Sequence, residues 1–323
     1  MQKISHIDPL GKMRQLTSNF GIYQHGYLEK PTPAFGYALD DQARALIVAN
    51  EFGDNRLERI YLNFIQEAIK RKDPYHYFYD EGEKVVPDRK IKCSDDALGM
   101  IVWAILKTKN ESDIQFVFDR IKEWEYPRAI AYAILGLLEG EEQEIEGFLI
   151  NKLVSLFREE GEWKWFDNYL TYGNALLPWA LWKRSVVRND KNSMKVAEIT
   201  TKFLIDNCQD QGVPMPIGCK GWYKKGGIKA KYDQQPVDAA YMICCLEQAY
   251  LATNNEYYRN QANSWWRWFW GNNTRGVSLI DQNGGCYDAI TDKSDKVNFN
   301  QGAESNISFP MAYLAAKRLG LTT

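Results

Sequence analysis

The chain has 323 residues, of which 45% are hydrophobic and 25% charged, and its formal net charge at pH 7 is −2. This composition is ordinary for a globular protein that is long enough to bury one large core. The near-neutral charge and the lack of a basic stripe argue against a nucleic-acid partner. No run approaches the roughly 18 apolar residues of a membrane-spanning helix, so we expect no membrane partner.

The six cysteines are scattered along the chain, and none of them forms a CxxC pair. The first residues, MQKISHIDPLGK, lack the apolar core of a signal peptide. Together these features predict reduced thiols and a cytoplasmic location. The chain has only three histidines and shows no Cys/His ligand set, so we expect neither a metal ion nor a cofactor.

Apolar residues recur at helical spacing along the whole chain, whereas strand-like alternation is nearly absent. After a first amphipathic segment at residues 9–20, two kinds of predicted helix alternate. One kind is apolar on nearly every side and begins with polar residues; it is predicted at residues 39–50, 93–107, 126–138, 169–184, 232–250 and 301–319. The other kind is amphipathic and is predicted at residues 55–72, 111–124, 142–159, 191–207 and 255–270.

A helix that is apolar on nearly all sides must be buried on nearly all sides, and an amphipathic helix can cover it from outside. Six helical hairpins closed into a ring meet both demands. We therefore predict an all-α (α/α)6 toroid, a single domain over residues 1–323, with an inner and an outer ring of helices. Parallel inner helices would place their polar starts, and the long loops before them, at one end of the ring, where we expect a cleft.

Several segments carry a further resemblance: GYALDDQARALI, WFDNYLTYGNALLPWAL, YDQQPVDAA, and GGCYD followed by NQGAES. These segments and the helix alternation resemble the six-hairpin glycosidase superfamily, and within it a bacterial group often encoded beside, or fused to, glycosyltransferases. The resemblance covers nearly the whole chain but includes no catalytic motif that matches residue for residue. It implies the toroid fold and carbohydrate chemistry, with an oligosaccharide or glycoside as substrate.

Glycoside hydrolysis commonly needs two carboxyl groups across the scissile bond, one protonated and one ionised. Nine acidic residues lie at the expected mouth: Asp40, Asp41, Asp95, Asp96, Asp167, Asp233, Asp238, Asp288 and Glu304. A helix N-terminus stabilises negative charge, so we expect Asp40, Asp41 and Asp238 to be ionised bases or hydroxyl-binding groups. Asp233 and Glu304 are the expected proton donors, and Asp167 completes the catalytic candidates.

Amide side chains both donate and accept hydrogen bonds, which suits sugar hydroxyls, and flat aromatic rings pack against the C–H faces of sugars. On these grounds the candidate substrate-binding residues are Asp238, Gln234, Gln235, Asn174, Arg44, Tyr172, Trp165, Tyr232, Gln301 and Tyr287. The acidic residues at helix starts also have an ordinary explanation as helix caps, and the amides as links between loops.

Other functions remain open beside hydrolysis. Sugar epimerases of the N-acylglucosamine 2-epimerase type share this fold but are expected to use histidines at the mouth, and no histidine here opens an inner helix. A polysaccharide lyase would need a more basic cleft. A non-catalytic glycan-binding or accessory subunit of a glycosyltransferase system is also compatible with the sequence, which does not give the oligomeric state.

Overall fold

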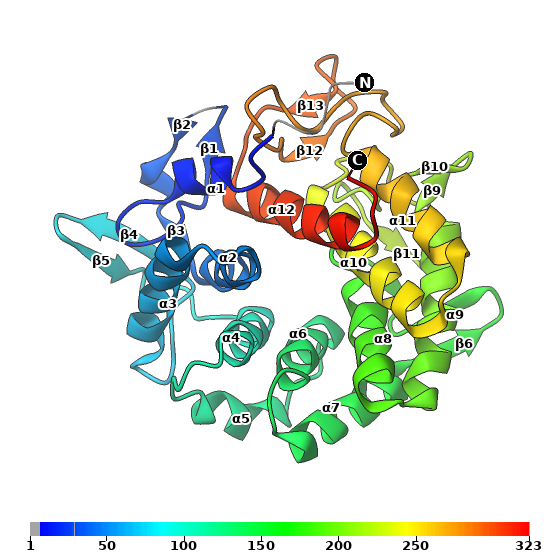
Figure 1. Ribbon diagram of the computed structural model, residues 1–323, viewed down its shortest axis with the longest axis horizontal. Coiled ribbons are helices and arrows are strands. Elements are labelled where there is room, and N and C mark those ends of the chain that lie inside the picture. Colours follow the sequence, from blue (N-terminus) through cyan, green and yellow to red (C-terminus); the bar gives the residue numbers. More distant parts are fainter. Residues whose placement is uncertain (1–6, 29, 323) are drawn as a thin grey trace.

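Six buried helices form a closed inner ring in the computed structural model, which describes residues 7–28 and 30–322. They are α2 (Leu39–Phe52), α4 (Asp95–Lys107), α6 (Pro127–Leu137), α8 (Leu176–Arg188), α10 (Pro236–Thr253) and α12 (Ala303–Arg318). Each inner helix contacts the next, and α12 contacts α2 to close the ring (Figure 1). Nearly every residue in the middle of these helices is buried, as their apolar composition requires.

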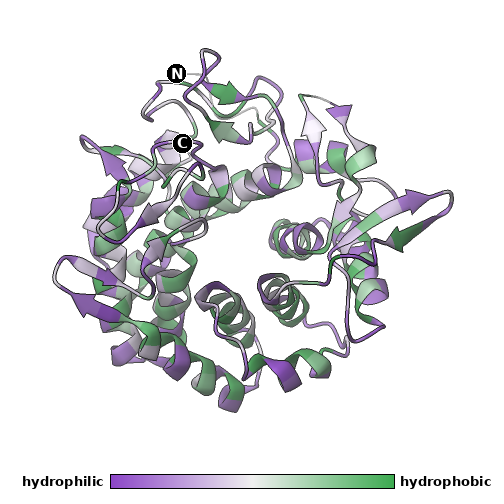
Figure 2. Ribbon diagram, turned by 180° about the vertical axis from the view of Figure 1, so that it is seen from behind, coloured by the Kyte–Doolittle hydropathy of each residue, from purple (hydrophilic) through white to green (hydrophobic). Residues whose placement is uncertain are grey.

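The outer helices cover the ring from outside. They are α3 (Asn55–Ile69), α5 (Gln115–Ile121), α7 (Gln143–Leu156), α9 (Lys191–Asn207) and α11 (Glu256–Trp268), while the short α1 (Gly11–Leu16) contacts α12. Hydrophilic residues lie on the outward sides of these helices and hydrophobic residues face the inner ring (Figure 2). This arrangement is an (α/α)6 toroid, and it confirms the predicted fold class.

The loops contain short antiparallel strands, which the sequence pattern did not predict. They pair as β1 (Gly26–Tyr27) with β2 (Lys30–Pro31), β4 (Tyr77–Glu81) with β3 (Tyr37–Ala38) and β5 (Lys84–Pro87), β6 (Arg158–Glu160) with β7 (Trp163–Trp165), β8 (Tyr169–Leu170) with β11 (Tyr223–Lys224), β9 (Gln209–Asp210) with β10 (Val213–Pro214), and β12 (Ala289–Ile290) with β13 (Val297–Asn298). A 3-10 turn, η2 (Pro33–Phe35), precedes β3. The β8–β11 pair ties together two loops at the same end of the ring.

The fourth inner helix begins seven residues later than predicted. Residues 169–175 form β8 and a turn, in which Gly173 has a φ of +65°. Such a backbone conformation suits glycine and ends regular helix geometry. The polar segment before α8 is therefore a loop that carries side chains to the mouth, and not a first helical turn.

The far end of the inner ring is bound by a chain of ion pairs. Five inner helices each contribute one charged side chain, and the sixth comes from Glu139, two residues after α6. In order the chain runs Lys183, Glu139, Lys107, Glu51, Arg318 and Glu247, so positive and negative charges alternate, over contacts of 2.5 to 3.4 Å. This chain stabilises the ring at the end opposite the inner-helix starts.

Two neighbouring inner helices approach so closely that only glycine fits between them. A Cβ atom added to Gly136 of α6 would lie 2.5 Å from the Cα of Trp103 in α4.

In the part of the chain that the structure describes, no helix is long and apolar enough to cross a membrane. All six cysteines are free, as expected.

Candidate active site

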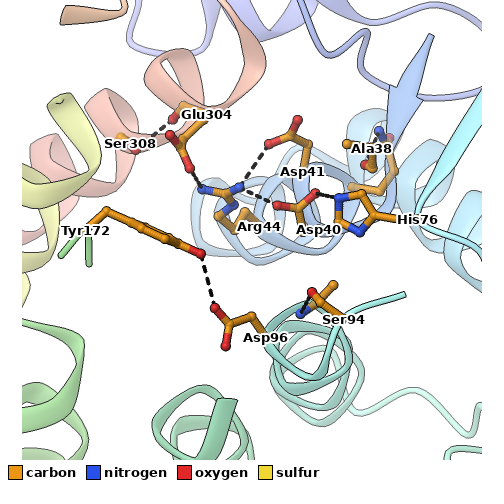
Figure 3. Close-up of polar contacts among 12 residues, drawn as sticks. Ala38, Asp40, Asp41, Arg44, His76, Ser94, Asp96, Tyr172, Glu304 and Ser308 are labelled. Atoms are coloured by element: carbon orange, nitrogen blue, oxygen red, sulfur yellow. Dashed lines mark hydrogen bonds and ion pairs between the residues drawn. The ribbon is translucent and has the colours of Figure 1, made fainter. Parts of the chain in front are cut away.

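The starts of α2 and α12 bring three carboxylates onto one buried guanidinium group. Arg44, on the second turn of α2, is only 4% exposed. Its Nη2 lies 2.8 Å from Asp40 Oδ2 and 3.2 Å from Asp41 Oδ1, and its Nη1 lies 2.6 Å from Glu304 Oε1. The contact with Glu304 crosses the seam where α12 closes the ring against α2 (Figure 3). We call these four residues the Arg44 cluster.

The carboxylates of the Arg44 cluster have different surroundings. The Asp41 side chain is 5% exposed, whereas that of Glu304 is 34% exposed. Desolvation by burial, together with the negative charges of Asp40 and Glu304, raises the pKa of Asp41 well above its ordinary value despite the attraction of Arg44. The expected lowering of the pKa of Asp41 by the helix N-terminus is therefore wrong, because the loss of water outweighs the helix dipole.

Two further carboxylates face the same space from long loops. Asp288 accepts a 2.8 Å hydrogen bond from the backbone N–H of Gly302, and burial raises its pKa. Asp233 lies 3.0 Å from the Nζ of Lys220 and forms an ion pair with it. The proton-donor role expected of Asp233 stays a prediction.

A cavity at the mouth of the toroid contains these groups and has two connected parts. The first, about 400 Å³, is lined by Asp41, Asp233 and Asp288, and we call it the acidic chamber. The second, about 520 Å³, is lined by Tyr172 and Trp222, and we call it the aromatic chamber. Other side chains, including those of Asp40, Arg44, Glu304 and Gln235, line both chambers and so mark their junction. Volumes of this size fall in the range of small-molecule sites.

The tyrosine of the aromatic chamber is held in place by several contacts. The hydroxyl of Tyr172 donates a 3.1 Å hydrogen bond to Asp96 Oδ2, and the guanidinium of Arg128 lies 4.0 Å from the centre of its ring. Arg128 in turn bonds the same carboxylate at 2.9 Å and the hydroxyl of Thr171 at 2.9 Å. Trp222 lies beside Tyr172, with 6.1 Å between the ring centres.

A buried carboxyl group supports the turn that carries Tyr172. Asp238, on the first turn of α10, is 7% exposed, and its Oδ1 accepts a 2.7 Å hydrogen bond from the backbone N–H of Gly173. Its Oδ2 is buried and has no hydrogen-bond partner among the residues that the structure describes. Burial raises the pKa of Asp238 to about 8, so the expected lowering by the helix N-terminus is wrong here as well.

A histidine that the sequence analysis set aside lines both chambers. His76 comes from the segment just before β4, and its Nε2 lies 3.5 Å from Asp40 Oδ1. Its Nδ1 is buried and has no hydrogen-bond partner within the described part of the chain. His25 also lines the acidic chamber and packs edge-on against Phe35. Neither histidine opens an inner helix, which agrees with the sequence, but both reach the mouth from loops.

The structure brings about half of the candidate residues to the cavity. Those that line it are Asp40, Asp41, Arg44, Tyr172, Asp233, Gln235 and Glu304. Those that do not are Asp167, Trp165, Asn174, Tyr232, Gln234, Asp238, Gln301 and Tyr287.

Most of the candidates outside the cavity have structural contacts. The side chain of Gln234 donates to Lys231 O and Thr274 Oγ1, and that of Gln301 donates to Asp281. Trp165 is buried and stacks on Phe203.

The other outside candidates are held in loops. Both side-chain atoms of Asn174 bond the backbone of Thr171, and Asp167 is exposed. Tyr232 lies under Arg275, and Tyr287 packs edge-on against Phe299.

The cavity residues that the sequence analysis did not name include Gln24, Tyr77 and Cys219. None of them opens a helix; they lie on loops or short strands, so the polar starts of apolar helices gave no signal for them. Among residues 7–28 and 30–322, no group of three or more His, Cys, Asp or Glu side chains is placed to hold a metal ion.

Comparison with known proteins identifies the fold. A scan against protein-family models finds no match, and a search of curated proteins finds none. Among solved structures, a D-mannose isomerase is similar, with 12% sequence identity and a TM-score of 0.69. A cellobiose 2-epimerase from Bacillus thermoamylovorans is similar with 13% identity and a TM-score of 0.67. Each of these two matches covers 96% of both chains. A GH76 α-mannanase from Bacteroides thetaiotaomicron is similar at 12% and 0.55, over 87% of this chain and 84% of the mannanase.

At this level of identity the likeness establishes the architecture. The chain shares its fold, an (α/α)6 toroid, with these structures, and this confirms the fold that the sequence resemblance implied. The activity of this chain has to be argued from its own site.

Proposed function

We propose that the protein is a carbohydrate-active enzyme that hydrolyses a glycosidic bond in an oligosaccharide or glycoside. The observation that carries this proposal is the contrast between two carboxylates on one guanidinium. Asp41 is buried with a raised pKa, and Glu304 is partly exposed and ion-paired with Arg44. Two carboxyl groups in such different surroundings are what acid and base roles require.

We propose Asp41 as the proton donor and Glu304 as its carboxylate partner, which reverses the roles expected from the sequence. Asp41 Oδ1 and Glu304 Oε1 lie 3.2 and 2.6 Å from nitrogen atoms of the same guanidinium, so the two carboxyl groups are close neighbours. Glycosidases likewise use a pair of neighbouring carboxyl groups. Arg44 fixes the pair, and the junction of the two chambers beside it offers space for the scissile bond.

The test is a sugar-release assay on a panel of α- and β-linked neutral oligosaccharides. We expect Asp41→Asn and Glu304→Gln each to reduce turnover by about 100-fold or more, because each removes one acid–base partner. Asp167→Asn is the matched control, since this exposed carboxylate lies outside the cavity and its loss should leave turnover unchanged. Full activity in both site variants would refute the hydrolase proposal.

A second candidate function, sugar epimerisation or isomerisation, is favoured by one observation. The imidazole of His76 lines both chambers, and histidine is the side chain that most often transfers protons in catalysis. Two structural neighbours are named as an epimerase and an isomerase. Proton NMR of the same reactions separates the two functions, because isomerisation changes the sugar without releasing a new reducing end and should then depend on His76.

A third outcome of the same assay would be binding without turnover. That result would favour a glycan-binding or accessory protein, and the carboxylates of the Arg44 cluster would then be hydroxyl ligands. The cytoplasmic location expected from the sequence stays a prediction.

A further inference from the structure

The two chambers of the cavity differ in chemistry. The acidic chamber presents five carboxylates, from Asp40, Asp41, Asp233, Asp288 and Glu304, with Arg44 as the buried cation among them. The aromatic chamber presents the rings of Tyr172 and Trp222 with Met100 and Ile91, beside the polar side chains of Lys92, Ser94 and Asp96. A ligand that spans the cavity therefore meets carboxylates at one end, and aromatic rings bordered by polar groups at the other.

The excess of carboxylates restricts what the acidic chamber can take. An anionic sugar, such as a uronate or a sugar phosphate, would face like charges at close range and would lose its hydration without a compensating partner. A neutral sugar faces no such repulsion, and its hydroxyls can donate to the carboxylates and to Gln235. The chamber therefore suits a neutral sugar ring.

Tyr172 has the properties of a rigid platform in the aromatic chamber. Its hydroxyl is fixed by Asp96, and one side of its ring is covered by Arg128. Its main-chain turn is held by the bond from Gly173 N to Asp238. A ring that is already immobile loses little conformational entropy when a ligand packs on it.

From this arrangement we infer that the cavity is a two-subsite channel for a neutral saccharide of at least two units. The acidic chamber takes one sugar, Tyr172 and Trp222 carry the next, and the bond between the two sugars lies at the junction beside Arg44 and Glu304. The inference rests on the proposed function for the position of that bond. Tyr172 is then the residue that decides whether a disaccharide binds better than a monosaccharide.

Calorimetric binding tests this inference without relying on turnover. The probes are maltose, cellobiose and α-1,2-mannobiose, with glucose and mannose as the single-sugar references and glucose 6-phosphate as the anionic one. The experiment uses the Asp41→Asn background, in which the proposed hydrolysis is suppressed. We expect at least one disaccharide to bind more tightly than either monosaccharide, and glucose 6-phosphate to bind more weakly than glucose.

Substitution of the platform should act on the disaccharide alone. Tyr172→Ala is expected to weaken disaccharide binding by about tenfold and leave monosaccharide binding within about twofold, because only the second sugar packs on the ring. Tyr172→Phe keeps the ring and should retain most of the affinity. If Tyr172→Ala does not fold, Trp222→Ala allows the same comparison at the neighbouring ring of the aromatic chamber.

Three results would overturn the two-subsite channel: no binding of any disaccharide, equal binding of disaccharides and monosaccharides, or equal weakening of both by Tyr172→Ala. Selective disaccharide binding without turnover by the wild-type protein would support the channel and count against hydrolysis. Turnover that is unaffected by Tyr172→Ala and Trp222→Ala would support hydrolysis and count against the channel.

Discussion

Replacing Asp238 by asparagine should change the way in which stability depends on pH. This side chain is 7% exposed, and its Oδ2 has no hydrogen-bond partner among the described residues. The contact from Gly173 N to Oδ1 is compatible with either carboxyl or amide oxygen, so Asp238→Asn keeps the shape and the bond. What the variant removes is the ability to ionise.

The size of the effect follows from the pKa of Asp238, which is about 8 in the folded protein against an ordinary value of 3.8. Between these values the native protein holds a proton that the unfolded chain has lost. The wild-type free energy of unfolding therefore falls as the pH rises, and this loss ends above the folded pKa. The slope is about 1.4 kcal/mol per pH unit, so the loss between pH 5 and pH 8 is at most about 4 kcal/mol.

Urea unfolding of wild type and Asp238→Asn at several pH values between 5 and 8 measures this difference. The variant should gain stability relative to the wild type as the pH rises. Asp54→Asn is the matched control: the pKa of Asp54 is lowered, against a desolvation penalty, by the hydrogen bond from Leu57 N–H and by Arg14, so it is ionised in both states across this range. If the difference in unfolding free energy between Asp238→Asn and wild type is as independent of pH as that of the control, the argument from burial is refuted.

Three further predictions test the site and the ring. Arg44→Met should lower the free energy of unfolding by about 3–5 kcal/mol, measured by urea unfolding, because it leaves buried carboxylates without their cation. A double-mutant cycle with Lys183→Met and Glu139→Gln should give a coupling energy of about 1–3 kcal/mol, since the pair is mostly buried. Gly136→Ala should destabilise the protein by about 1–3 kcal/mol, because the added Cβ would lie too close to Trp103. Gly147→Ala should stabilise it by up to about 1 kcal/mol, because a Cβ at this position meets no atom within contact distance. Equal thermal melting of the two variants would contradict both predictions.

The toroid could be predicted because the inner helices leave few other arrangements. A helix such as α10 is buried over most of its length, and that requirement is visible in its composition alone. The start of a helix was harder to predict where the preceding loop has apolar residues at helical spacing. The turn at Gly173 depends on Asp238, which lies 65 residues further along the chain, and no local pattern reports such a contact.

The candidate site was predictable in part for the same reason. Asp40, Asp41 and Glu304 begin inner helices, so a ring of parallel helices had to bring them together. The protonation of each carboxyl group could not be derived this way, because it depends on burial and on charges from other helices. His76 was set aside because it opens no inner helix; it stands just before β4, so its position depends on how β4 pairs with β3.

The charge balance of the Arg44 cluster decides which carboxyl group keeps a proton. Arg44 supplies one positive charge to three carboxylates, so full ionisation would leave excess negative charge in a nearly dry place. Repulsion and desolvation act most strongly on Asp41, whose side chain is 5% exposed against 20% for Asp40 and 34% for Glu304. A sugar that filled the acidic chamber would remove more water and so raise the pKa of Asp41 further. Hydrolysis that uses this proton must slow as the pH rises past the raised pKa of Asp41, and the alkaline limb of the pH–rate profile should disappear together with the activity in Asp41→Asn.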